Sequence, residues 1–487
     1  MSRNLSASPA LFLLALTGCV VGPGYQPPKV AVPSGWSEAP AASEPAPETP
    51  SHWWTAFGDP ELDSLIDRAA RANLDVQLAE ARVSEARANR LISKAALLPQ
   101  AGATGSYARS KQGTLPPTSL FQAGLDASWE IDVFGGNRRA VEAANADLAA
   151  SIYDRGDVLL TLLAEVATNY IDLRGYQRQL EVARQNLASQ RDTLDLTQAR
   201  YQGGLGTDLA VAQAEAQVET TASTIPTLEI SAGDAVHRLG VLLGEPPSSL
   251  VAELSASSPI PAAPSALPAG LPSDLLRRRP DVRRSERQLA AATARIGVAT
   301  ADLYPKFSLT GSAGLSSAST SNLFSAASRL LSIGPSFTWP IFQGGQIRAN
   351  IEVHDAQAQQ ALIVYRQSIL TAMEDAENAI LSFNRERDRR EILAAAARSN
   401  ERAAQYATQL YLRGLSDFLS VLDAQRNLFA AQTSLAQSET AVSADLVALH
   451  KALGGGWEAF PLTKETPENP APSASSTHPP TENTTKS

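Results

Sequence analysis

The sequence predicts a mainly α-helical protein that carries a small β part and repeats its own architecture once. Three observations support this prediction. Two very long Ala-rich stretches have no internal proline, short segments between helices alternate apolar with polar residues, and the two halves of the chain match each other in order. Aromatic residues make up only 6% of the 487 residues, which favours helices packed through small side chains over an aromatic-rich core.

The internal repeat is visible as identical residues at a nearly constant separation. The matched pairs include Pro99 with Pro305, Gly105 with Gly311, Glu165 with Glu374, Tyr201 with Tyr411, and Gly204 with Gly414. The separation rises only from 206 to 210 positions along each half. Chance identity between Ala-rich helices would scatter over many separations, so we interpret the match as an internal duplication.

Each half is predicted to contain the same series of elements. A helix ends near a proline, two strands follow, a very long helix comes next, and a glycine turn leads to a returning helix. The predicted ranges are 74–98, 101–111, 123–134, 137–202 and 208–243 in the first half, and 280–303, 306–317, 332–343, 346–413 and 416–453 in the second. The first long helix would reach roughly 100 Å, with Gly156 and Gly175 as expected points of bending. Such lengths favour coiled-coil packing.

The N-terminus carries a targeting signal. Arg3 gives a positive start, and the apolar run from Ala10 to Leu16 is too short to span a bilayer. Cys19 is the only cysteine of the chain and follows Leu16-Thr17-Gly18, where cleavage would occur. This segment resembles a bacterial lipobox, in which the cysteine is acylated and becomes the mature N-terminus. An ordinary signal peptide with a chance cysteine nearby is the alternative.

Changes in composition divide the chain into six parts. The predicted parts are a signal peptide (1–18), a lipidated tether (19–52), the first repeat (53–243), a linker (244–273), the second repeat (274–456) and a disordered tail (457–487). The tether and the tail are rich in Pro, Ser, Ala and Glu, and we expect neither to build a core.

The predicted strands have one apolar and one polar face. About ten residues is also the length that crosses a membrane in a β-barrel. The predicted lipid-facing residues are Leu125, Trp129, Ile131, Phe307, Leu309, Phe337 and Trp339. The predicted lumen-facing residues are Asp126, Glu130 and Asp132. Two soluble hairpins packed on the helices are the alternative. Because four strands cannot close a membrane barrel, the chain must pool strands with one or two further copies.

Other function classes find little support in the composition. The net charge of −9 argues against nucleic acid as a partner. The five histidines are scattered without metal-ligand spacing, and we find no catalytic Ser/His/Asp set and no phosphate-binding loop. We therefore expect no enzymatic activity, no metal, and no cofactor other than a covalent lipid on Cys19.

Several segments, taken in order and in duplicate, resemble the outer membrane factors, which are TolC-like channels. The resemblance is to the NodT-type lipoprotein branch that serves RND efflux systems. The segments are the lipobox, WWTAFGDPELDSLI (53–66), LRRRPDVRRSE (276–286), WEIDVFGG, PIFQGG, RYQGGL and LYLRGLSDFLSVLDAQ. Together they span about 19–456, nearly the whole mature chain.

This resemblance implies a fold, a location and partners. It implies a homotrimer with a twelve-stranded barrel in the outer membrane lipid and a helical tunnel, or α-barrel, in the periplasm. The closed end would dock on a periplasmic membrane fusion (adaptor) protein linked to an inner-membrane RND pump. The implied function is a passive exit duct for drugs, metals or other small toxic compounds. A periplasmic coiled-coil structural lipoprotein and an exit channel for a secretion system are the alternatives.

The resemblance also assigns roles to the two helix turns. The implied adaptor contacts are Gly204, Leu205, Gly414 and Leu415, although glycine is also what a tight turn requires. The implied periplasmic gate is Asp417, with Leu412 and Arg413 as weaker candidates. Asp417 is equally suited to cap a helix. Its counterpart in the first half is Thr207 or Asp208, so which turn lines the narrowest point stays open.

Overall fold

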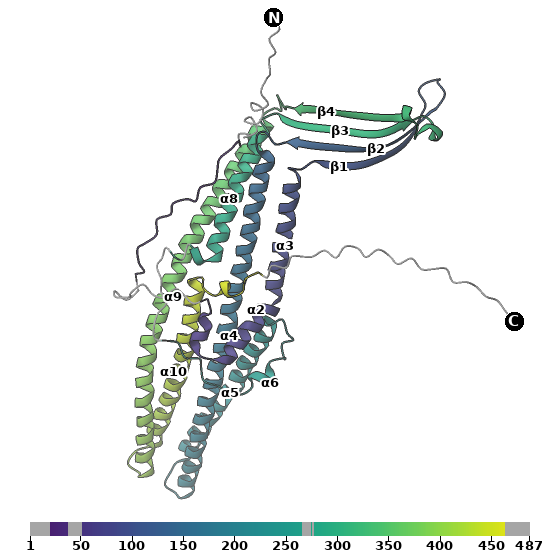
Figure 1. Cartoon of the computed structure of the whole chain (residues 1–487). Coiled ribbons are helices and arrows are strands. Elements are labelled where there is room, and N and C mark those ends of the chain that lie inside the picture. Colours follow the sequence, from purple (N-terminus) through teal and green to yellow (C-terminus); the bar gives the residue numbers. More distant parts are fainter. Residues whose placement is uncertain (1–19, 38–50, 265–273, 275–276, 463–487) are drawn as a thin grey trace, which may run out of the picture.

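The protein folds into an elongated helical body with a four-stranded sheet at one end (Figure 1). The computed structural model describes residues 20–37, 51–264, 274 and 277–462. The first half contains α3 (Leu74–Ala95), β1 (Gln100–Ser110), β2 (Thr118–Ile131), α4 (Gly136–Gln202) and α5 (Asp208–Leu242). The second half contains α8 (Pro280–Ala301), β3 (Lys306–Ser317), β4 (Arg329–Thr338), α9 (Gln346–Leu412) and α10 (Phe418–Ala452).

The two halves are structural copies of each other. Their helices have pairwise equal lengths, with 22 residues in α3 and α8, 67 in α4 and α9, and 35 in α5 and α10. All strands pair antiparallel in the order β1-β2-β3-β4. The hairpins also share one register, because Gln100 lies opposite Ser128 and Lys306 lies opposite Thr338. The predicted series of elements is therefore confirmed.

Two of the predicted strands have different bounds. Strand β2 begins five residues earlier than expected, at Thr118, and β4 spans Arg329–Thr338 in place of 332–343. Trp339 thus lies just beyond its strand, where Pro340 lacks the N–H that a ladder needs. Asp132 also lies beyond its strand, because β2 ends at Ile131.

The two glycines within the first long helix do not interrupt it. Helix α4 runs unbroken past Gly156 and Gly175. A Cβ at Gly175 would lie 2.3 Å from Oγ1 of Thr440 on α10, and one at Gly156 would lie 3.0 Å from the Trp457 ring. These glycines serve close packing, because any larger side chain would push the neighbouring element away.

The ends of the chain are more ordered than predicted. Within the predicted tether, residues 20–37 have no helix or strand but lie against the body: the Tyr25 hydroxyl donates to Glu286 (2.8 Å) and Trp36 is buried. The predicted disordered tail begins with the 3-10 turn η5 (Trp457–Ala459), and Arg155 donates to the carbonyl of Phe460 (2.8 Å). These aromatic side chains give both segments something to bury.

An aromatic cluster lies midway along the body, within a core that otherwise consists mainly of Ala, Leu, Val and Ile side chains. The turn η2 (Trp53–Phe57) and α2 (Pro60–Ala72) are packed against α4. Trp53 stacks on His450 of α10, with ring centroids 4.9 Å apart, and Trp54 stacks on Phe460. Burial lowers the pKa of His450 to about 4, so this ring is neutral in the folded protein at neutral pH.

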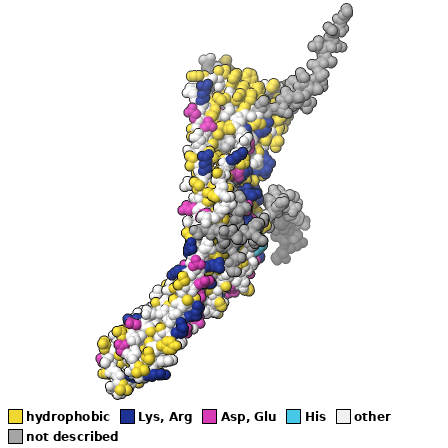
Figure 2. Space-filling model, turned by 90° about the vertical axis from the view of Figure 1, so that its left-hand side faces the viewer, with side chains coloured by type: hydrophobic (Ala, Val, Ile, Leu, Met, Phe, Trp, Pro, Cys, Tyr) yellow, Lys and Arg dark blue, Asp and Glu magenta, His cyan; other side chains and the backbone are white. Residues whose placement is uncertain are grey.

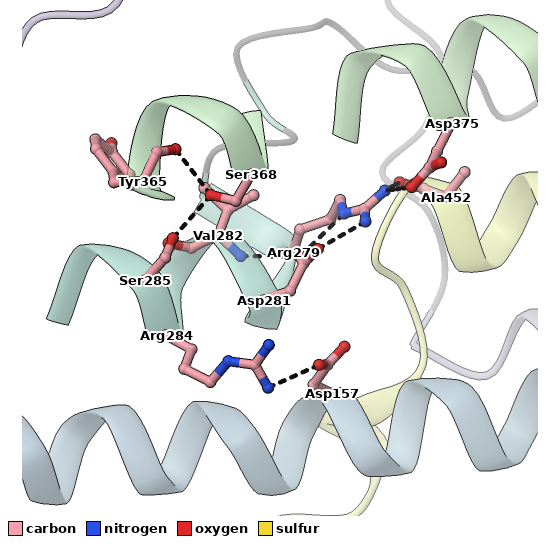
Figure 3. Close-up of polar contacts among 10 residues, drawn as sticks. All are labelled: Asp157, Arg279, Asp281, Val282, Arg284, Ser285, Tyr365, Ser368, Asp375 and Ala452. Atoms are coloured by element: carbon pink, nitrogen blue, oxygen red, sulfur yellow. Dashed lines mark hydrogen bonds and ion pairs between the residues drawn. The ribbon is translucent and has the colours of Figure 1, made fainter. Parts of the chain in front are cut away.

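Charged side chains join the two repeats at the start of α8 (Figure 3). Arg279 is 8% exposed and contacts Asp281 (2.7 Å), Asp375 of α9 (2.9 Å) and the carbonyl of Ala452 on α10 (3.3 Å). Arg284 extends the network to Asp157 on α4 (3.0 Å). Burial opposes the charged form of Asp281, but hydrogen bonds and attraction from Arg279 prevail and lower its pKa. Motif 276–286 thus ties α8 to three other helices.

We predict that Gly175→Ala lowers stability and that Gly233→Ala does not. The first change forces a methyl group onto Thr440 and should cost about 1–3 kcal/mol. Gly233 lies inside α5 with nothing within 4 Å of its would-be Cβ, so alanine should add about 0.5–1 kcal/mol. Thermal unfolding in detergent measures both. Equal midpoints for the two variants would show that α4 and α10 do not need this close approach.

Candidate functional site: the two-faced sheet and the helix tips

The strand register gathers the predicted lipid-facing residues on one face of the sheet. Residues directly opposite each other in a sheet share a face. Trp129 lies opposite Leu309, Ile131 opposite Phe307, and Phe307 in turn opposite Phe337. Leu125 follows by alternation along β2. The face that these six residues share is apolar; that it meets lipid stays a prediction.

The other face of the sheet is polar. Asp126 lies between Gly102 and Ser312 and accepts a hydrogen bond from Thr104 (2.9 Å). Glu130 lies opposite Ser308 on the same face. Asp132 does not belong to this face, because β2 ends at Ile131 and the Asp132 carboxylate accepts hydrogen bonds from the backbone N–H groups of the first turn of α4. Its role is to begin that helix.

Two tryptophans join the sheet to the helices. The indole of Trp129 donates to the carbonyl of Leu97 (3.0 Å), and that of Trp339 donates to Leu303 (3.1 Å). Leu97 and Leu303 follow the last turns of α3 and α8, where carbonyls lack helical partners. The same bond therefore recurs in both repeats at the inner end of the sheet. Aromatic residues with a polar tip are typical of membrane–water interfaces, so this position agrees with the predicted barrel.

The opposite end of the body consists of two helix turns (Figure 1). Gly204 and Gly414 adopt φ of +70° and +71°, which favours glycine, so the turns need these residues. Beside them Leu205 and Leu415 are 72% and 71% exposed. Burial of such an exposed apolar side chain against a partner protein is energetically favourable. Contact with an adaptor stays a prediction.

Asp417 caps a helix at the second turn. It precedes α10, and its carboxylate accepts hydrogen bonds from the Ser420 hydroxyl (2.8 Å) and backbone N–H (3.1 Å). These two bonds lower the pKa of the Asp417 carboxyl. Leu412 and Arg413 are at the end of α9 on the same turn. The cap is observed, and the gate assignment of all three residues stays a prediction.

Arg200 is a tip residue that the sequence analysis missed. It reaches from α4 to the other hairpin and donates to the carbonyls of Tyr411 (3.1 Å) and Leu412 (3.3 Å). Its guanidinium also lies 4.7 Å from the centre of the Tyr411 ring. One feature of the sequence does single out Arg200: its repeat counterpart is Leu410, so the two halves differ at this position. Arg200 thus links the two tips, alongside a buried apolar cluster to which both hairpins contribute.

Cys19 lies outside the described residues, so its lipidation is untested. The residues that follow it are placed: Val21 donates its N–H to the carbonyl of Phe134 (3.1 Å), and Arg139 donates to the carbonyls of Val21 and Gly22. These contacts lie where β2 passes into α4. The described chain therefore starts at the junction of sheet and helices.

None of the helices in the described ranges combines the length and the apolar character needed to cross a membrane. No three His, Cys, Asp or Glu side chains in these ranges gather where a metal ion could bind.

Comparison with known proteins accounts for this arrangement. The family model described as "Outer membrane efflux protein" matches residues 65–245 and 271–455. The chain belongs to this family. Nodulation protein T of Rhizobium leguminosarum bv. trifolii is 35% identical over 451 residues, 92% of this chain and 96% of that protein. Pyoverdine export outer membrane protein OpmQ of Pseudomonas aeruginosa is 37% identical over 472 residues, 94% and 97% of the two chains.

Solved structures agree with the sequence relatives of this outer membrane efflux protein. The outer-membrane channel OprN is 36% identical and covers 90% of this chain and all of its own, with a TM-score of 0.85. The channel CusC is 30% identical over the same share, with a TM-score of 0.79. Family and fold are thus those of channel proteins, not of enzymes. The protein is an outer membrane efflux channel with a long helical part in the periplasm.

We predict that Arg200→Leu loosens the tips of this channel protein. The variant carries the residue type of the repeat counterpart and loses two charge-assisted hydrogen bonds. Backbone amides of residues 196–212 and 405–422 should exchange with deuterium about tenfold faster. Arg191→Gln removes an exposed cation on the same helix and should leave exchange at the wild-type rate. Unchanged exchange in Arg200→Leu would mean that other contacts hold the tips.

Proposed function

We propose that this channel is the exit duct of a tripartite RND-type efflux system and works as a homotrimer. Each repeat, 53–243 and 274–456, supplies one hairpin, so three copies form a twelve-stranded barrel above a periplasmic tunnel. Drugs, metal ions or other small toxic compounds leave passively through it. The observation that carries the proposal is a two-faced sheet with open edges, continuous with helices that span roughly 100 Å.

The open edges support the oligomer. Strands β1 and β4 each have a neighbour on one side only. A row of unpaired backbone N–H and C=O groups is not tolerated in hydrocarbon, so a membrane sheet has to close on itself. Four strands are too few, whereas pairing β4 of one copy with β1 of the next closes a ring of twelve.

The outer helix faces support the same assembly. On the inner seam between α4 and α8, Arg284 pairs with Asp154 (2.6 Å). The repeat counterparts of these two residues are Leu78 on α3 and Ile363 on α9, and both are exposed. Apolar side chains also lie in open view on the face that carries α9 (Figure 2). The ion pair lies inside one protomer, whereas its two apolar counterparts lie on the outer surface. Another copy of the chain would bury these apolar side chains.

The ordered start of the chain supports a lipid anchor on Cys19. Val20 packs at the inner end of the sheet, beside Gly135. An acyl chain on the preceding residue would enter the inner leaflet of the outer membrane without any long tether. Residues 244–273 would then be an equatorial connection between the repeats, partly formed by α6 (Val251–Leu254).

The tips would meet the adaptor protein and carry the gate. Leu205 and Leu415 offer exposed apolar surface beside Gly204 and Gly414, and Asp417 from three copies would form an acidic ring. Carboxylates around one axis attract cations and repel each other. The relatives are named for nodulation, pyoverdine export and cation efflux, so we assign the choice of cargo to the pump.

A periplasmic spacer lipoprotein needs the helices but not the two-faced sheet. A secretion channel shares all of these features except the RND pump. Purified protein separates the first alternative from a channel: a trimer from outer-membrane fractions that conducts ions in planar bilayers supports the duct. Monomers without conductance would refute it. Copurification with an adaptor and an RND pump after cross-linking distinguishes efflux from secretion.

We predict that replacing the Asp417 carboxylate raises single-channel conductance. Asp417→Ala loses both the acidic ring and the helix cap, whereas Asp417→Ser keeps a side chain that can cap. Both variants should conduct more than the wild type in planar bilayers, because both remove the charge. An increase in Asp417→Ala alone would assign the effect to the cap, and no change in either would remove Asp417 from the gate.

We also predict that Leu415→Asp abolishes efflux while the trimer stays folded. A charge at this exposed position leaves the fold intact but cannot be buried against an adaptor without a large penalty. Leu115→Asp is the matched control, because Leu115 is exposed in the β1–β2 loop at the opposite end. Drug susceptibility of a strain that lacks its own duct is the readout. Full resistance with Leu415→Asp would argue against docking at this tip.

A further inference from the structure

The outer end of the sheet is purely cationic. Between residues 101–125 and 307–337 the charged residues are Arg109, Lys111 and Arg329, and none is acidic. All three are exposed, at or next to the strand ends that lie away from the helices. Within the described residues, none of their side chains makes a hydrogen bond or an ion pair. Three cations without counter-charges mark a surface that another molecule can neutralise.

Arg109 and Arg329 lie on the apolar face. Arg329 lies opposite Leu315, which shares a face with Leu309 and Phe307 by alternation. Arg109 lies opposite Ser119, which shares a face with Leu125. Lys111 directly follows the last residue of β1, Ser110, at the same end of the sheet. The face that the proposed barrel turns towards lipid therefore ends in a cationic rim on its outer side.

The repeat gives the register between copies. Because the two hairpins have equal registers, each residue of β1 corresponds to the residue of β3 that lies 206 positions later. Each residue of β2 corresponds to the residue of β4 that lies 210 positions later. The observed pair Ala127–Gly311 then corresponds to Phe337 of one copy opposite Gly105 of the next.

Counting along the strands from this pair brings the three cations together. Four residues further on, Ile333 of one copy faces Arg109 of the next. Arg329, which begins β4, and Lys111, which follows the end of β1, therefore lie at the same outer end of the seam as Arg109. Each seam between copies carries one such group of three cations.

We infer that Arg329 of one copy, with Lys111 and Arg109 of the next, binds the phosphate groups of the outer-leaflet glycolipid, lipid A. This inference rests on the proposed trimeric barrel. Lipid A carries two phosphates on a sugar head group above several acyl chains, which matches cations placed directly above an apolar wall. Arginine suits this ligand because its planar guanidinium binds phosphate through two hydrogen bonds. The rings of Tyr107 and Phe121, 4.7 Å apart, lie just below and suit the lipid interface.

The test compares lipid binding by purified trimers. Native mass spectrometry in detergent measures binding of diphosphoryl lipid A to the wild type, to Arg109→Gln/Lys111→Gln/Arg329→Gln, and to Arg191→Gln. Each cation near an anionic surface is worth about fivefold in affinity, so the triple variant should bind at least tenfold more weakly. Arg191→Gln, exposed near the far end of α4, should bind as the wild type does. Dephosphorylated lipid A should bind to the wild type as weakly as diphosphoryl lipid A binds to the triple variant.

Two results would overturn the inference. Wild-type affinity of the triple variant, or equal binding of dephosphorylated lipid A, would show that these cations do not hold phosphate. The conductance and the oligomeric state of the same samples distinguish a failure of the lipid site from a failure of the channel proposal. Conducting trimers with unchanged lipid binding refute the lipid site alone, whereas a monomeric wild type refutes the proposed barrel and, with it, the seam.

Discussion

The rest of the architecture depends on the hydrogen-bonding requirement of the sheet's two open edges. Hydrocarbon offers no partner to a backbone N–H or C=O, so in the proposed barrel β1 and β4 need neighbours that one chain cannot supply. Because the two hairpins repeat in register, β4 of one copy can pair with β1 of the next in the same geometry as β2 with β3. The equal helix lengths of the two repeats fit such a ring of six similar units.

Duplication leaves a trace of where the copies had to differ. Arg284 and Asp154 form an ion pair inside one chain, whereas their counterparts Leu78 and Ile363 are apolar and exposed. The tips show the same divergence, because Arg200 holds the neighbouring hairpin whereas Leu410 does not. Function in a repeat protein is thus easiest to find where the repeat is broken.

The sequence predicts the periodic parts of this protein well and the contacts poorly. Helix and strand order, the turns at Gly204 and Gly414, and the apolar face of the sheet follow from local patterns. The packing role of Gly175, the cap made by Asp132 and the reach of Arg200 depend on partners far along the chain, which periodicity does not reveal. The order of segments 20–37 and 457–460 is difficult to predict, because their composition resembles that of linkers although a few aromatic side chains pack against the body.

In the proposed twelve-stranded barrel, the shared hairpin register also fixes the width of the pore. Crossing two strands from β1 to β3 advances the pairing by four residues relative to the repeat. The tilt of the strands follows from the ratio of two lengths, four residues along a strand and two inter-strand spacings across the sheet. This ratio gives a tilt of roughly 55° from the barrel axis, steeper than the 35–45° common in barrels. Twelve strands at that tilt enclose a cylinder about 32 Å across, against about 24 Å at 40°. A small number of strands can therefore surround a wide opening, and the stagger sets that bore.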